Sequence, residues 1–226
     1  MTSQLGDHLY RFWLRFSPCF KTRTRDTSRN AYDYLRAQLT MERERNFANI
    51  DRTLNGGDGQ ALEHFMARSP WLGQVVFQQI QAEIKATPIL AQGGTLILDE
   101  SADEKAGTHT AGASRQYNGR LGKVDLCRVD TCRVYAHLKA KVWTLVDGEL
   151  FLREEWLSKA FAEKRKELGI PKDRQFETKI ALGLKMIKRV KANGVPFDLL
   201  ACDTLYGRDG QFRADLNAEN VAYAAQ

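Results

Sequence analysis

Two aspartates stand where short apolar segments end. Residues 95–98 follow Gly93 and Gly94 and lead into Asp99, and residues 197–202 lead into Asp203. Apolar runs of this length, bounded by turn-forming residues, indicate buried strands. Acidic side chains at the ends of adjacent buried strands are suited to holding a divalent metal ion against a phosphate. Each aspartate taken alone is equally well explained as the start of a turn, so the intervening sequence decides.

The stretch after Asp99 predicts an antiparallel meander. Extended segments at about residues 124–136 and 141–146 are rich in Val, Leu, Tyr and Thr, and Asp147-Gly148 predicts a hairpin before residues 150–152. Residues 105–123 predict a glycine-punctuated loop. This loop has neither a G-x-G-x-x-G nor a Walker pattern, which leaves a nucleotide-binding loop unsupported.

Helices are predicted at residues 154–168 and 176–191, the second ending at Asn193-Gly194. Its apolar face holds Phe176, Ile180, Leu184, Ile187 and Val190, and its other side holds Lys179, Lys188 and Arg189. A helix between two neighbouring strands is the crossover that parallel pairing requires. That pairing would bring Asp203 next to Asp99. A short helix near residues 211–217 and a strand from Val221 follow.

Residues 1–92 predict helices whose apolar stripes form a core. Residues 8–16 fit an amphipathic helix, and Ser69 with Pro70 predicts a helix start near residue 69. A helix-turn-helix is possible, but no residue indicates base readout.

The charge distribution favours a protein that binds a polyanion such as nucleic acid, and the cysteine content favours a cytosolic protein. Residues 11–52 carry ten Lys or Arg against five Asp or Glu, and residues 153–191 carry twelve against six. Such basic segments attract nucleic acid, although solvated helix faces explain them as well. The four cysteines lack metal-type spacing and are expected to be reduced, mostly buried thiols. No apolar run approaches the length of a membrane span.

The order of predicted elements resembles the opening of the ribonuclease H-like fold. Five motifs, in the right order, also resemble bacterial insertion-sequence transposases of the DDE class. They are residues 64–71, 96–101, 115–124, 150–156 and 203–207. The resemblance implies an α+β or α/β protein, with a helical, DNA-binding region at residues 1–92. An incomplete ribonuclease H-like mixed sheet with helices, the catalytic domain, would then occupy residues 93–226.

The family resemblance also implies metal-dependent DNA strand cleavage and strand transfer. In this chemistry three acidic residues hold two Mg²⁺ ions, for which Mn²⁺ can substitute. Asp99 and Asp203 match the first two acidic positions, as catalytic and metal-binding residues. Arg115 and Lys123 are candidates for DNA phosphate contacts, with solvated loop charges as the alternative. The implied partners are double-stranded DNA, at transposon ends and target, and a second copy or full-length transposase, in the cytoplasm with the nucleoid and without a membrane.

The third acidic residue departs from the family pattern. It should lie on a helix well downstream of Asp203, whereas Glu219 falls at a helix–strand junction and is a poor substitute. The expectation is therefore a truncated copy, inactive by itself. The alternative is a non-catalytic DNA-binding remnant that inhibits full-length transposase. A standalone nuclease would need a complete acidic site, and a purely structural helical protein leaves the paired aspartates unexplained.

Overall fold

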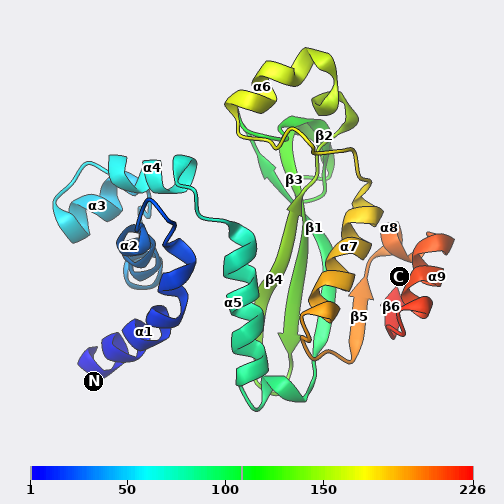
Figure 1. Ribbon diagram of the computed structural model, residues 1–226, viewed down its shortest axis with the longest axis horizontal. Helices are drawn as coiled ribbons and strands as arrows, with labels where there is room; N and C mark the ends of the chain where they lie inside the picture. The colour runs from blue at the N-terminus through cyan, green and yellow to red at the C-terminus, as the bar shows by residue number, and fades with distance from the viewer. Residues whose placement is uncertain (1, 108, 226) are drawn as a thin grey trace. The chain divides into compact units, whose positions relative to one another are not determined.

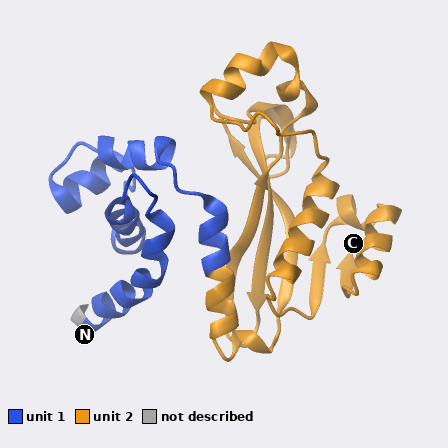
Figure 2. Cartoon of the chain, viewed as in Figure 1, with its two compact units in different colours: residues 1–79 blue, residues 80–226 orange. Residues whose placement is uncertain are grey.

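The computed structural model describes residues 2–107 and 109–225. The chain forms two compact units, Met1–Gln79 and Ile80–Gln226 (Figure 2). The boundary lies inside helix α5 (Gly73–Ala86), because Ile80 and Ile84 pack into the core of the second unit. The last turns of α5 therefore belong with the sheet.

The first unit is helical (Figure 1). Its elements are α1 (Thr2–Phe16), the 3-10 helix η1 (Ser17–Phe20), α2 (Ser28–Thr40), α3 (Phe47–Asn55), α4 (Gln60–Arg68) and the start of α5. Much of its core is aromatic. The Trp13 ring stacks on Phe20 at 5.4 Å between centroids, and Phe65 stacks on Trp71 at 5.6 Å. The amphipathic helix predicted at residues 8–16 is found within α1.

The helix start predicted at Ser69 and Pro70 is wrong. Ser69 instead ends α4 in an extended conformation, and the next helix begins at Gly73. The indole N–H of Trp71 donates to the Phe65 carbonyl oxygen at 3.1 Å while the two rings stack. This anchoring ties the intervening residues to α4 and delays the next helix.

The second unit is built on a mixed, six-stranded sheet (Figure 1). The strands are β1 (Thr95–Glu104), β2 (Ser114–Asn118), β3 (Lys123–His137), β4 (Val142–Leu150), β5 (Leu199–Cys202) and β6 (Tyr223–Ala225). Strand β1 pairs antiparallel with β3 and parallel with β5, and β6 adds parallel to β5. Both β2 and β4 pair with β3. A helical region followed by a mixed sheet with helices confirms the predicted fold class.

Helix α7 is the crossover that joins the meander to β5. The second unit contains η2 (Leu90–Gln92), η3 (Glu154–Leu157), η4 (Lys159–Phe161), α6 (Ala162–Glu167), α7 (Lys179–Ala192), α8 (Thr204–Gly207) and α9 (Gly210–Ala218). From α7, the side chains of Met186, Ile187 and Val190 are fully buried in one cluster with Leu96 and Leu200. Burial of this apolar stripe holds α7 on the sheet.

Two predicted helices differ from the structure. The single helix predicted at residues 154–168 is broken into η3, η4 and α6, because Ser158 is extended between η3 and η4. Helix α7 begins later than predicted, with Thr178 as its N-cap accepting a hydrogen bond from the Ala181 N–H. Phe176 therefore precedes the helix and is exposed instead of lying on its apolar face.

The hairpin predicted at Asp147-Gly148 is also wrong. Both residues lie inside β4, and the connection from β3 to β4 falls at residues 138–141. Asp147 is fully buried and accepts two hydrogen bonds from Arg189 of α7, at 2.7 and 2.8 Å. A paired, buried carboxylate replaces the exposed turn that Asp-Gly usually indicates. Arg189, predicted to face away from the core, reaches back to the sheet.

Other expectations concern the loop, the thiols and the membrane. Part of the loop predicted at residues 105–123 forms β2, with its alternate side chains buried. The four cysteines are free, and Cys132 alone among them is half-buried rather than buried. Within residues 2–107 and 109–225, no helix is both long and apolar enough to cross a membrane.

Candidate active site

Asp99 and Asp203 follow the last paired residues of two parallel neighbouring strands. The β1–β5 register runs from Thr95 opposite Leu199 to Leu98 opposite Cys202. Strand β1 does not end at Asp99, as the sequence predicted, but continues beside β3 to Glu104. The parallel pairing with β5 is what ends there, so the two aspartates come next on adjacent strands.

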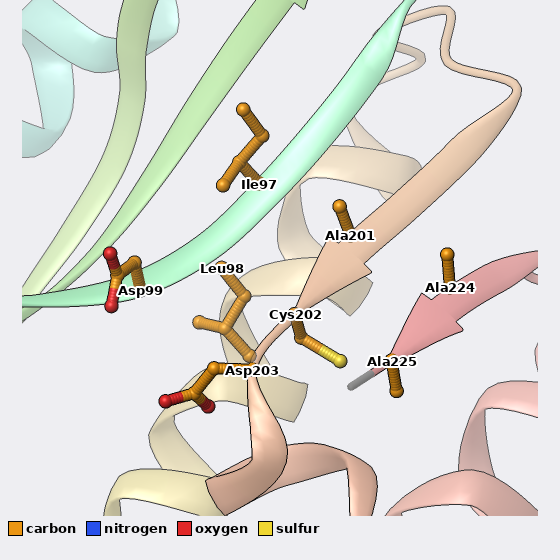
Figure 3. Close-up of a pocket in the computed structure, with 8 residues that line it drawn as sticks. All are labelled: Ile97, Leu98, Asp99, Ala201, Cys202, Asp203, Ala224 and Ala225. Carbon is orange, nitrogen blue, oxygen red and sulfur yellow. The ribbon is translucent and has the colours of Figure 1, made fainter.

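The two aspartates line the same surface hollows. One cavity of about 370 Å³ is formed by both aspartates with Leu98, Cys202 and four further residues (Figure 3). A second, of about 510 Å³, is lined by Asp99, Glu100, Ser101, Ala102, Tyr117, Gly119, Arg120, Val129, Lys179 and Asp203. We call this second cavity the acidic cleft. In it, two exposed carboxylates face the same solvent as two basic side chains.

Each aspartate carboxylate is oriented by one backbone N–H group. Asp99 Oδ1 accepts from the Glu100 N–H at 2.7 Å, and Asp203 Oδ1 accepts from the Leu205 N–H at 3.0 Å. The second bond makes Asp203 the N-cap of α8. The turn-former interpretation is therefore correct for Asp203 without excluding a ligand role, because neither bond uses Oδ2.

Glu100, Arg120 and Lys179 are cleft residues that the sequence did not single out. The Lys179 ammonium lies 3.2 Å from Glu100 Oε2, and Arg120 lies 3.3 Å from Glu104. Glu100 and Arg120 fall inside the motifs at residues 96–101 and 115–124, which was the available signal. Lys179 had been identified only as a charge on the outer face of a helix.

The candidate DNA contacts Arg115 and Lys123 lie near this region without lining the acidic cleft. Arg115 is exposed on β2, opposite Leu126 of β3. The Lys123 ammonium lies 3.0 Å from Asp125 and, by its hydrogen bond, lowers the pKa of that carboxyl. Both side chains are thus exposed at the β2–β3 end of the sheet that also supplies Arg120.

Two ionisable residues of the second unit, Tyr206 and Arg133, are fully buried. Tyr206 of α8 has no exposed surface, and burial, with the charge of Glu100, raises its pKa well above the usual value. Burial lowers the pKa of Arg133 to about 9, and its guanidinium donates to the Gly183 carbonyl. The charge of Arg133 acts on Tyr206 in the opposite sense to Glu100.

The donor set fits a hard divalent cation. Mg²⁺ and Mn²⁺ bind carboxylate and water oxygens, and Asp99 with Asp203 offers two carboxylates at one open edge. In the described part of the chain, no group of three His, Cys, Asp or Glu side chains is arranged around one metal position. Glu219 pairs with Lys188 at 3.3 Å and Lys191 at 3.7 Å.

Known proteins resemble the chain over most of its length. Residues 15–226 match the family model described as DDE superfamily endonuclease. The chain is also 29% identical over 199 residues to a protein of Microchaete diplosiphon named "Probable transposase for insertion sequence element IS701". That match covers 85% of this chain and 47% of the relative, so the chain spans about half the length of the curated relative it matches. The resemblance inferred from the five motifs is thereby confirmed.

Proposed function

Because the chain belongs to the DDE superfamily of endonucleases, we propose that it acts on double-stranded DNA as an insertion-sequence transposase. Its chemistry is metal-dependent strand cleavage and strand transfer. The name of the Microchaete diplosiphon relative supports this substrate class. That relative is about twice as long as the matched region, so the proposal covers the site carried by this chain.

The observation that carries the proposal is the placement of Asp99 and Asp203 at the same end of two neighbouring parallel strands. Both follow directly on the Leu98–Cys202 pair of parallel strands and both line the acidic cleft. Carboxylates that directly follow the ends of one parallel ladder lie on adjacent strands, and this placement supports a shared cation. Arg120 and Lys179 line the same cleft and supply the positive charge that DNA phosphates would contact.

In the proposed function, the two aspartates of the cleft bind a cation and its basic residues bind DNA phosphate. Asp99 and Asp203 would hold a divalent cation at the open edge of the sheet. When bound there, the cation would supply activation of a water or a 3′-hydroxyl and stabilisation of the leaving oxygen. Arg120 and Lys179 neutralise DNA phosphate and orient the strand over the aspartates.

A second candidate is DNA binding without cleavage, including pairing with a longer transposase. It is favoured by the ion pairs of the two other acidic residues considered as ligands, of which Glu100 lines the cleft and Glu219 does not. Glu100 pairs with Lys179, and Glu219 pairs with Lys188 and Lys191, so neither is free to complete a two-metal site. The two functions share the DNA surface and differ in whether the chain alone turns over.

Binding of Mn²⁺ tests the proposed site. It is measured by the loss of the electron paramagnetic resonance signal of free Mn²⁺. The wild-type chain is expected to bind Mn²⁺ more than about tenfold more tightly than Asp99→Asn or Asp203→Asn, since each substitution removes a charged ligand. Asp198→Asn is the matched control, because Asp198 directly precedes β5 at its opposite end. Equal affinity of the wild type and Asp99→Asn would overturn the proposal.

A further inference from the structure

The separation of Asp99 and Asp203 is not fixed by the sheet. Parallel pairing stops at Leu98 and Cys202. Beyond that point β1 continues beside β3, while the other chain leaves the sheet and enters α8. Two ligands of one cation would need a defined separation, so some contact beyond the ladder must hold them.

Glu100 makes such a contact. The Tyr206 hydroxyl donates to Glu100 Oε1 at 2.7 Å, and the Lys179 ammonium donates to Oε2 at 3.2 Å. Glu100 directly follows Asp99 on β1, Tyr206 lies in the helix that Asp203 caps, and Lys179 begins α7. One carboxylate thus ties the strand of the first aspartate to the turn of the second.

Tyr206 has little freedom to move away from this bond. Its ring is fully buried and lies 5.7 Å from the Phe212 ring between centroids. Helix α7 also approaches the ring closely at Gly183, where an added Cβ would lie 3.0 Å from the Tyr206 ring. This close packing restricts the ring and keeps its hydroxyl at Glu100.

We propose that Glu100 and Tyr206 are positioning residues, whose hydrogen bond sets the separation of the Asp99 and Asp203 carboxylates for a divalent cation. The inference rests on the proposed function. Glu100 is not itself a ligand in this arrangement, because both of its oxygens are committed to Tyr206 and Lys179. A cation would have to compete with Tyr206 or Lys179 for a Glu100 oxygen.

Tyr206→Phe is the sharpest test, because it removes the hydroxyl and keeps the ring. Its affinity for Mn²⁺ is expected to fall about 10- to 100-fold, the usual effect of losing a residue that orients a metal ligand. Tyr135→Phe is the matched control. Tyr135 is equally buried, and its hydroxyl donates to Leu90 O at 2.6 Å and Gly93 O at 3.1 Å, before the start of β1.

The control removes a buried hydroxyl from the same core, so it lowers the unfolding temperature but is expected to keep wild-type Mn²⁺ affinity. Equal losses of affinity in Tyr206→Phe and Tyr135→Phe would mean general loosening of the core and would overturn the inference. Wild-type affinity in Tyr206→Phe would overturn it too, and would leave the proposed function standing if Asp99→Asn still binds weakly.

Variants of Glu100 separate positioning from ligation. Glu100→Gln keeps an oxygen that accepts from Tyr206, so it is expected to bind Mn²⁺ more tightly than Glu100→Ala. A ligand role would give a different pattern: Glu100→Gln would bind as weakly as Glu100→Ala and Asp99→Asn, and Tyr206→Phe would be unchanged. That pattern would overturn the inference. Equal Mn²⁺ binding by the wild type and Asp99→Asn would instead show that the proposed function itself had failed.

Discussion

Cys132 of β3 lies directly opposite Asp99 of β1 in the antiparallel pair. Its thiol is half-buried, and burial, followed by the charges of Asp130 and Asp99, raises its pKa to about 11. The thiolate is the reactive form of cysteine. Cys132 therefore reports on charge at the candidate metal site.

We expect Cys132 to react slowly with a disulfide reagent such as DTNB at pH 8, where roughly one thiol in a thousand is ionised if its pKa is about 11. The rate should rise about tenfold per pH unit up to that pKa, because the thiolate fraction does. Asp99→Asn removes a negative charge, lowers the pKa and should speed the reaction. Cys132→Ser gives the background rate, and a rate unaffected by Asp99→Asn would contradict the electrostatic coupling.

The pairing of Arg189 with buried Asp147 is expected to be a main stabiliser of the α7–sheet contact. Arg189→Met would remove the two hydrogen bonds that Arg189 donates to the fully buried Asp147 carboxylate and should lower the free energy of unfolding by about 3 kcal/mol, measured by urea denaturation. Lys188→Met, at the preceding residue, removes an exposed ion pair with Glu219 and should cost less than about 1 kcal/mol. Similar losses in the two variants would show that the buried pair is not special.

Much of the fold could be predicted because its signals are local. The crossover helix, its stop at Gly194 and the strand that follows depend on nearby residues, and the parallel neighbour follows from the handedness and length of such connections. The Asp147-Gly148 hairpin failed because a long-range contact with Arg189 overrode the usual preference of these residues for a turn.

Only part of the candidate site could be predicted from the sequence, because the rest depends on long-range contacts. Asp99 and Asp203 each follow an apolar run of residues, which is a visible pattern. The bond from Tyr206 to Glu100 joins residues that are far apart in the sequence, and nothing local to either residue indicates its partner. Likewise, Arg120 and Lys179 meet at one cleft only because β2, β3 and α7 converge there in the folded chain.

DNA binding is expected to be strongly salt-sensitive, because it depends on basic side chains meeting phosphates. In gel-shift titrations over a salt series, Arg120→Ala should reduce the slope of log K against log salt by about 0.9, the effect of one lost phosphate contact. Arg115→Ala and Lys123→Ala test the contacts predicted from sequence in the same way. Lys139→Ala, in the β3–β4 turn beyond the other end of β3, should keep the wild-type slope. Salt-independent binding would contradict a phosphate-based interface.

The last prediction is that the 226-residue chain, purified alone, does not cut DNA in Mg²⁺ or Mn²⁺. Two-metal phosphoryl transfer needs both ions clamped about 3.5–4 Å apart, so that the attacking and leaving oxygens are held together. Asp99 and Asp203 offer carboxylates for this purpose, while Glu100 is held by Tyr206 and Lys179 and Glu219 is paired with lysines. Misaligned ligands cost orders of magnitude in rate, because alignment supplies much of the catalysis.

Conversion of supercoiled plasmid to nicked circles measures this activity, with Mn²⁺ binding as the check that the protein is folded. The expected result is metal binding without nicking above the level of Asp99→Asn. Nicking by the wild type that Asp99→Asn abolishes would refute the prediction and require a third ligand. Glu100→Gln and Glu219→Gln would then identify it: the ligand's substitution would stop nicking, whereas the other would leave it measurable. Nicking that survives both substitutions would point to a carboxylate from a second copy of the chain, and a nicking rate that rises more steeply than in proportion to protein concentration would support that source.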